Sequence, residues 1–564
     1  MRRPLLTCIS LLVAALLPPI SAARACPGGA VPPGARPENE PPLSESARAF
    51  VIAPVEEDDG PVIAGAASPA AEEANRLFEA HRWEDAALAA RAVTAGETGD
   101  SEMPRRLARY HQAISLAHLG FPEGSLALFT AVAERKTHPR FSETLRQIAI
   151  LAEGREEQDR FAELVNHYDE QAIAQFDTPR DRALHDRLRY LQGIARARLR
   201  DHVQAIYALE KVSRESPLFL HARFRMGIGY VSLRKTVPAA KAFSTMAEAA
   251  GEGQPHLRDL ALISMARAYY SSNHYLDEPC TPTIDGARLS AAVKYWNRIS
   301  PESEYWPEAL LESSWAYFMA GDYPHALGNL QVFESGYLQP TRAPEADLLR
   351  GLIAYTTCQY EDVVTWIARM QQRYRPVRAA LTTLITTLAG EAQDEAVLTY
   401  FDALHAGMAA MSTPLEPLTE RVLRDRRAHR ERLRLHALDD EDAHLQRSSA
   451  RLRSSALGRE IAVSLRVARR VATHDLAVRI RTLHQDRLED LDHQLLDGQK
   501  LLLDVARSEA EERLRRSEMG SSDLQGYGPI QPDVEHVIWP FDGEYWRDEL
   551  GGYRHIVQSR CFNR

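Results

Sequence analysis

Between residues 187 and 250 the pattern of small and apolar residues repeats after 34 positions. A shift of 34 superimposes five pairs: Gly193 on Gly227, Ala205 on Ala239, Tyr190 on Phe224, Leu199 on Leu233 and Leu209 on Phe243. Small residues let two helix backbones approach each other, and larger residues fill the space that remains between them. The repeat therefore predicts antiparallel helix pairs, each too small to bury its apolar face alone and each stacked on the next.

The best single copy of the pattern runs from residue 309 to residue 327. An aromatic helix face is followed there by a Gly-Asp-Tyr turn and a closing alanine, and its signature positions are Trp315, Gly321, Tyr323 and Ala326. A 34-residue period with these positions is typical of the tetratricopeptide repeat (TPR), a helix–turn–helix unit. We therefore expect an all-α chain in which about six to eight units form a TPR-like superhelical solenoid over residues 70–400.

One unit has an enlarged turn between residues 276 and 287. Pro279, Cys280 and Pro282 forbid regular helix in this stretch. An insertion between helices projects on one face of a solenoid, and that face is often the binding face. A tolerated surface loop is the simpler interpretation, and we favour it.

Residues 415–520 have a different character, because Val422 to Arg516 contains no proline and is dense in charges. Apolar residues recur at steps of three, four and seven: Leu476, Ile480, Leu483, Leu491, Leu495, Leu502 and Val505. Long helices packed as a coiled coil or a hairpin are expected, although a break near Arg487 argues against one long zipper. The arginines between 421 and 434 suggest a phosphate-binding face, but the interspersed Asp425 and Glu431 favour a solvated helix surface.

The C-terminal segment, residues 521–564, is rich in aromatic residues. Trp539, Phe541, Tyr545 and Trp546 lie within eight positions of one another. Aromatic side chains at this density require burial, either against the same chain or against a partner. We expect this segment to dock on the long helices, and an exposed partner-docking motif is the alternative.

The first 25 residues have the features of a secretory signal peptide. Arg2 and Arg3 precede a short apolar run, Leu5–Leu17, and Ala23-Arg24-Ala25 forms a small-x-small cleavage site. The apolar run is too short to span a bilayer comfortably, so an uncleaved membrane anchor is the less favoured interpretation. Residues 26–69 are rich in proline and acidic residues, which predicts a disordered linker. The protein is therefore expected to be exported to the periplasm, with peripheral outer-membrane association as a further option.

Four cysteines remain after removal of the signal peptide: Cys26, Cys280, Cys358 and Cys561. An even number in an oxidising compartment favours disulfides, and sequence alone leaves three pairings open. We favour Cys280 with Cys358, because both lie in neighbouring helical units. Cys561 would otherwise pin the C-terminal segment covalently. Cys26 would be the lipidated residue of a lipoprotein, although Ala23 and Arg24 fit a lipobox poorly.

Motifs for catalysis or cofactor binding are not found in the sequence. It has no phosphate-binding loop, no His-Glu-x-x-His and no Gly-x-Ser-x-Gly, and the 20 histidines are scattered. The net charge of −10 gives no reason to expect nucleic acid as a partner. We therefore assign no catalytic, cofactor-binding or metal-binding residues and do not expect an enzyme.

Three blocks resemble a known group of proteins. They are residues 303–327, the Cys358-Gln359-Tyr360 turn, and the Trp-Pro-Phe-Asp-Gly-Glu-Tyr-Trp-Arg-Asp-Glu-Leu stretch at 539–550. Together they are similar to exported TPR proteins of deltaproteobacteria, some of which are associated with the envelope machinery of adventurous gliding motility. The resemblance implies a periplasmic or outer-membrane-associated adaptor and brings no catalytic residues with it.

Two functions follow from these expectations. The first is an envelope adaptor whose concave face grips a protein partner, while the long C-terminal helices supply a second interface. The alternative is a structural spacer that forms homo-oligomers through those helices. Repeat scaffolds bind through their surfaces, so the sequence predicts a shape for the protein but no ligand.

Overall fold

α-Helices paired along the chain account for nearly all of the regular structure. The structure, a computed structural model, describes residues 65–153, 159–272, 285–335, 337–338, 344–406, 415, 422–423, 425–519 and 543–561. Within these ranges there are 21 α-helices and no β-strand. The expected all-α class is therefore confirmed.

The first helices form a stack that begins near residue 69. They are α3 (Pro69–Glu79), α4 (Trp83–Thr94), α5 (Glu102–His118), α6 (Pro122–Ala133), α7 (Phe141–Leu151), α8 (Asp159–Val165) and α9 (Glu170–Ala174). Extensive contacts join α3 to α4, α4 to α5 and α5 to α6. Helices α3 to α6 therefore pack mainly on their neighbours in sequence, as in a structure that grows by addition.

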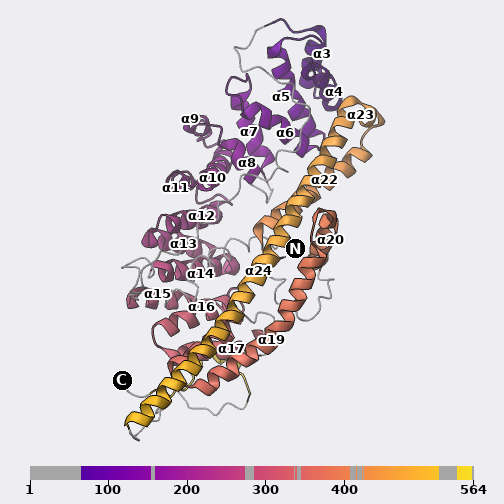
Figure 1. The fold of residues 1–564 in the computed structure, drawn as a ribbon. Coiled ribbons are helices and arrows are strands. Elements are labelled where there is room, and N and C mark those ends of the chain that lie inside the picture. The colour runs from indigo at the N-terminus through magenta and orange to yellow at the C-terminus, as the bar shows by residue number, and fades with distance from the viewer. Residues whose placement is uncertain are drawn as a thin grey trace.

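The stack continues with ten further helices (Figure 1). They are α10 (Arg182–Arg198), α11 (His202–Glu210), α12 (Phe219–Ser232), α13 (Thr236–Ala250), α14 (Pro255–Ser272), α15 (Gly286–Trp296), α16 (Trp306–Met319), α17 (Tyr323–Val332), α18 (Pro344–Thr356) and α19 (Tyr360–Thr387). The enlarged turn expected at 276–287 falls between α14 and α15, and most of it lies outside the described residues.

Six of the helix pairs are closed by the same kind of turn. One residue in each adopts a left-handed conformation: His81, Gly120, Arg200, Arg234, Gly321 and Cys358. The next residue donates its N–H to the carbonyl five positions back, as from Asp201 to Arg196 at 2.9 Å and from Lys235 to Tyr230 at 2.8 Å. These bonds satisfy carbonyls that the end of a helix leaves without partners. The recurrence shows that the pairs share one turn geometry despite their different sequences.

The small residues of the repeat lie where paired helices come closest. A Cβ atom on Gly193 would lie 2.4 Å from Cγ of Leu209, and one on Gly227 would lie 2.3 Å from Cε1 of Phe243. Ala205 and Ala239 are buried on the second helix of each pair. In the later copy, Trp315 and Tyr323 pack against a core that contains Ala326, and Gly321 forms the turn.

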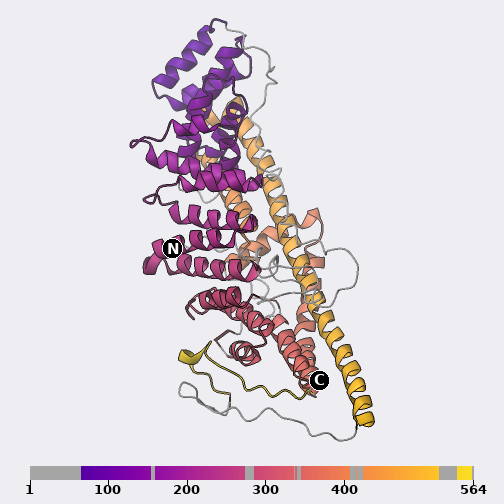
Figure 2. The ribbon, with the colours of Figure 1, turned by 90° about the vertical axis from the view of Figure 1, so that its left-hand side faces the viewer.

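The C-terminal helices run back along the stack. They are α20 (Asp394–His405), α22 (Arg426–Arg447), α23 (Ala450–Ser454) and α24 (Ala456–Met519). Short 3-10 helices occur at Gly251–Gly253, Glu391–Gln393 and Arg547–Glu549. Helix α24 has 64 residues and is therefore ~96 Å long. It packs antiparallel to α22, then against α20, α19 and α18 (Figures 1 and 2).

Helix α24 and its neighbours contact both ends of the stack. One apolar core joins Phe121 and Phe129 of the first pairs to Leu438 of α22 and Ile461 of α24. A second core joins α18 and α19 to the distal half of α24, where Tyr355 and Ser508 share a hydrogen bond of 3.0 Å. The long helices are thus part of the same folded body rather than a free coiled coil.

Candidate partner-binding surface

One side of the first helix pairs is already covered by α22. Arg430 forms an ion pair with Asp159 of α8, and the carboxylate of Glu441 accepts a hydrogen bond from the backbone N–H of Glu123 in α6. His444 donates to the carbonyl of Leu119 at 2.7 Å. These contacts are buried or partly buried. A partner could therefore reach this side of α6 and α8 only by displacing α22.

The described part of the C-terminal segment, residues 543–561, crosses the last helices of the stack (Figure 2). The backbone N–H of His555 donates to the carbonyl of Pro324 at 3.0 Å. Any Cβ on Gly328 of α17 would lie 1.7 Å from the carbonyl oxygen of Tyr553, so only glycine permits this approach. Leu550 joins the core that contains Trp306. The expectation that this segment docks on the long helices is wrong for these residues, which pack on α16, on α17 and on the turn that follows α18.

The four aromatic residues predicted to dock a partner do not share one environment. Tyr545 accepts a hydrogen bond from Nε2 of Gln331 at 3.2 Å, and its ring packs against the core of α12–α16. Trp546 is 40% exposed. Trp539 and Phe541 lie outside the described residues. Of these four aromatics, Trp546 is therefore the one that the structure places at the surface.

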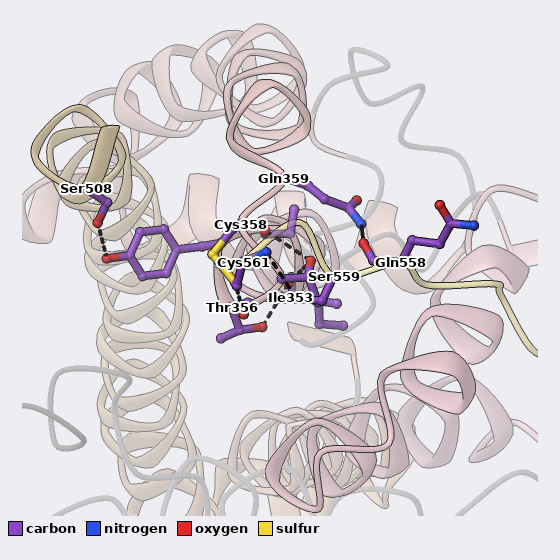
Figure 3. The surroundings of a disulfide bond; sticks show 11 residues. Ile353, Thr356, Cys358, Gln359, Ser508, Gln558, Ser559 and Cys561 are labelled. Carbon is purple, nitrogen blue, oxygen red and sulfur yellow. Dashed lines mark hydrogen bonds between the residues drawn. A yellow bond between two sulfur atoms is a disulfide. The ribbon is translucent and has the colours of Figure 1, made fainter. Parts of the chain in front are cut away.

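A disulfide holds the end of this segment to the α18–α19 turn (Figure 3). It joins Cys358 to Cys561, which are 203 residues apart in the sequence. The expected pairing of Cys358 with Cys280 is therefore wrong; Cys280, like Cys26, lies outside the described residues. Beside the disulfide, Arg560 N–H donates to the Thr357 carbonyl at 2.8 Å and Gln359 Nε2 to the Gln558 carbonyl at 2.6 Å. The chain end thus follows the turn in an extended form.

A buried charge cluster lies between α14, α15 and α16. Arg267 donates from Nε to Glu312 at 2.9 Å, and the indole of Trp296 donates to the same carboxylate at 3.0 Å. Burial raises the pKa of Glu312, and the positive charge of Arg267 opposes that rise. Because the carboxylate is held by donors from two other helices, the cluster joins three helices and offers no oxygen to a substrate.

Exposed apolar side chains gather at the α10–α11 and α12–α13 turns. Leu199, Val203, Tyr207 and Val237 are between 48% and 70% exposed. Val203 and Val237 are one 34-residue repeat apart, as are Leu199 and the half-buried Leu233. Equivalent positions of stacked repeats share one edge of the stack. We call this region the turn-edge surface and define it by Leu199, Val203, Tyr207, Val237 and the basic residues described next.

Basic residues accompany these apolar ones. Arg200 and Arg234 occupy the left-handed positions of the two turns, and Lys235 follows directly. Arg196 lies in the last turn of α10. Asp201, in the same stretch, caps α11: its carboxylate accepts a hydrogen bond from the backbone N–H of Gln204 at 3.2 Å. The turn-edge surface is therefore locally basic on a protein whose net charge is −10.

A shallow pocket adjoins the turn-edge surface. It has a volume of about 270 Å³ and is lined by Glu170, Gln192, Arg196, Gln204 and Tyr207. Hydrogen bonds from Arg189, and then from Lys211, lower the pKa of Glu170 to about 2. Glu170 is thus ionised at physiological pH, and two cations already neutralise it. Arg196 adds a further positive charge to the wall of the pocket.

The size and lining of this pocket limit what it can hold. Sites for small-molecule ligands usually measure about 300–1,000 Å³ and are mainly apolar. A smaller pocket with amide, guanidinium and phenol groups suits one acidic side chain or a chain end. Among the residues that the structure describes, no cluster of three or more His, Cys, Asp or Glu side chains is arranged to hold a metal ion. No described helix is long and apolar enough to cross a membrane.

The signature residues predicted from the sequence do not belong to the turn-edge surface or its pocket. Gly193, Gly227, Ala205 and Ala239 lie between helices, where they determine packing. The turn-edge surface is not among the sequence predictions. A signal was present, because leucine or valine recurs next to arginine at equivalent turn positions, Leu199-Arg200 and Leu233-Arg234.

Comparison of the chain with known protein families finds no match, and comparison with curated proteins finds none either.

Proposed function

We propose that the protein is a non-enzymatic scaffold that binds protein partners in the cell envelope. In this proposal the stack is a TPR solenoid, and the protein acts in the periplasm or at the outer membrane, as the resemblance to gliding-motility proteins suggests. The observation that carries the proposal is the turn-edge surface. Clustered exposed apolar residues mark interaction sites on soluble proteins more often than isolated ones do.

The chemistry of the surface indicates the kind of partner. Leu199, Val203 and Val237 offer apolar contacts, while Arg196 and Lys235 offer positive charge. An acidic protein segment that carries apolar side chains would complement both features. One carboxylate of that segment would enter the pocket beside Arg196 and accept a charge-assisted hydrogen bond from its guanidinium.

Site-specific photo-crosslinking in cells tests this proposal. A crosslinker at Val203 or Val237 is expected to capture one envelope protein through an acidic segment, which mass spectrometry identifies. Val364 of α19 is the matched control, because it is similarly exposed and lies on another helix. The proposal is wrong if Val203 and Val364 give the same products, or if the captured segments are not acidic.

Charge reversal then tests the role of the pocket. Arg196→Glu is expected to weaken binding of the identified partner at least about tenfold, because it places a carboxylate beside Glu170 and repels the acidic ligand. Lys294→Glu, at an exposed position of α15, is the control for a change in net charge. Isothermal titration calorimetry with the purified partner measures the affinity of both variants. If both variants lost the same amount of affinity for the partner, the overall charge of the protein would be the cause. The pocket would then have no role in binding.

A further inference from the structure

Residues 543–561, which we call the strap, cross the last helices of the stack mostly in extended form (Figure 2). Among the strap side chains that the structure describes, Leu550 alone is buried, and the others are exposed or half-buried. The backbone makes further contacts, as where the N–H of His555 donates to the carbonyl of Pro324 at 3.0 Å. The strap is therefore held at separate points and has no packed core of its own.

An apolar site on α16 lies beneath the strap. Trp306 and Leu310 are 6% and 5% exposed, and they share a core with Leu550. A Cβ atom on Gly551 would lie 3.7 Å from Cζ2 of Trp306 and 3.8 Å from Cδ2 of Leu310, so the strap backbone lies directly over both side chains. Removal of the strap would expose part of both, and another apolar segment could then cover them.

The strap also indicates which segments the site accepts. Leu550 enters the apolar core, and Gly551 follows with a φ of +91°, a conformation that favours glycine. Tyr553 packs against the same core, and its carbonyl lies against Gly328 of α17, where no side chain would fit. An extended segment with a large aliphatic residue, a glycine directly after it and an aromatic residue two positions further on would make the same contacts.

The disulfide between Cys358 and Cys561 fixes the far end of the strap (Figure 3). Both cysteines are half-buried, which leaves the bond partly accessible to a thiol. Cys358 occupies the left-handed position of its turn, and Gly321 occupies the same position one pair earlier, so the turn itself does not require a cysteine. Since an extended segment loses conformational entropy when it is ordered, breaking this bond favours release of the strap.

We propose that the strap is a redox-controlled cover of a docking site for an extended segment of a protein partner. While the disulfide is intact, the strap occupies the site. After reduction the strap exchanges with a partner segment that has the same aliphatic–glycine–x–aromatic pattern, and this segment packs on Trp306 and Leu310 and passes Gly328. The inference rests on the proposed scaffold function only in taking the occupant to be a protein.

The reductant is a protein with two thiols, and the reaction is thiol–disulfide exchange. One thiolate attacks a sulfur of the Cys358–Cys561 bond, forms a mixed disulfide and releases the other cysteine as a thiolate, which takes up a proton. The second thiol, as a thiolate, then attacks the mixed disulfide and releases the remaining cysteine. Two electrons pass in total: both cysteines are reduced, and the dithiol becomes a disulfide.

Hydrogen exchange of the full-length protein tests release of the strap. Reduction with dithiothreitol is expected to speed exchange of the His555 amide at least about tenfold, because its bond to Pro324 is lost with the strap. The Lys235 amide, which donates to Tyr230 in the α12–α13 turn, is the control and should not change. Faster exchange confined to the residues next to Cys561 would mean that the strap stays bound, and would overturn the proposal.

A labelled peptide of residues 543–561 with Cys561→Ser, followed by fluorescence anisotropy, tests the site. It is expected to bind a full-length Leu550→Asp/Cys561→Ser chain, whose own strap is weakened, at least about tenfold more tightly than the oxidised wild type. Adding Gly328→Ala to that chain should lower the affinity at least about tenfold, although alanine suits the interior of α17. Gly286→Ala, with no atom near its would-be Cβ, is the matched control. Absence of binding, or equal affinity for the two glycine variants, would overturn the proposal.

Crosslinking in cells identifies the occupant of the site. A photo-crosslinker at Gln331, whose side chain donates to the Tyr545 hydroxyl, is expected to capture the strap in the wild type and a partner segment with the stated pattern in Cys561→Ser. Capture of the strap alone in both, or of a segment without that pattern, would contradict the inference. Capture at Val203 or Val237 concerns another surface, so the scaffold function and this inference can fail separately.

Discussion

At the scale of single residues, the stack depends on a few positions where a side chain would not fit. Gly193 and Gly227 occupy the same place in successive pairs, and each faces a large residue of the partner helix, Leu209 or Phe243. The first atom met at Gly193 is Cγ of Leu209, which is close to the backbone and cannot move aside freely. Helix spacing in this part of the stack is therefore determined by the absence of one Cβ atom.

Gly193→Ala is accordingly expected to lower the free energy of unfolding by about 1–3 kcal/mol, the usual cost of overpacking a core. Urea denaturation followed by circular dichroism measures the change. Gly286→Ala is the matched control: it lies in the first turn of α15 with no atom near its would-be Cβ, and alanine favours helix. If both variants unfolded at the same urea concentration, close packing at Gly193 would not be the reason for glycine there.

At the scale of elements, the C-terminal segment is held by its ends rather than by a large core. Leu550 is buried near Trp306, the backbone around Tyr553 lies against Gly328, and Cys561 is bonded to Cys358. Between these points the described residues form no α-helix or strand. An extended segment of this kind loses much conformational entropy when it is ordered, so its covalent attachment matters to its position.

Cys561→Ser is therefore expected to lower the free energy of unfolding by about 2–4 kcal/mol, because the disulfide closes a long loop in the unfolded chain. It should also make residues 543–561 accessible to limited proteolysis. Ser559→Ala, two residues away, is the control variant. A reductant should reproduce the proteolytic sensitivity in the wild type. Finding free thiols at Cys358 and Cys561 in the oxidised protein by mass spectrometry would contradict this assignment.

At the scale of the whole molecule, several histidines are buried or half-buried, which favours their neutral form. Burial lowers the pKa of five of them to about 4: His111, His138, His221, His405 and His484. In the unfolded chain these groups titrate near 6.5. Between these values the unfolded state binds more protons than the folded state, so stability is fully present above pH 6.5 and is lost as the pH falls toward 4.

Stability is thus expected to fall between pH 7 and pH 5, and His484 alone should contribute about 2 kcal/mol to that fall. This ring joins α24 to α20 through a hydrogen bond with the Tyr400 hydroxyl at 3.1 Å. His484→Gln keeps a hydrogen-bonding group there and should flatten the pH dependence of the urea midpoint. His493→Gln, on the exposed side of α24, should leave it unchanged. An equally steep profile for His484→Gln would show that this histidine is charged in the fold.

Much of the stack could be predicted from the sequence by itself. The 34-residue period, the small residues and the turn residues determine helix pairs and their packing on neighbours, because these interactions join residues close in the chain. The all-α class, the proline-free helices after residue 422 and the turn at Gly321 follow from such local preferences.

Only the tertiary structure decided what lies far apart in the sequence and close in space. The pairing of Cys358 with Cys561, the approach of Tyr553 to Gly328 and the covering of α6 by α22 depend on the summed geometry of many stacked helices. The turn-edge surface is decided in the same way. An apolar residue becomes a surface feature only after the fold determines which other residues are covered.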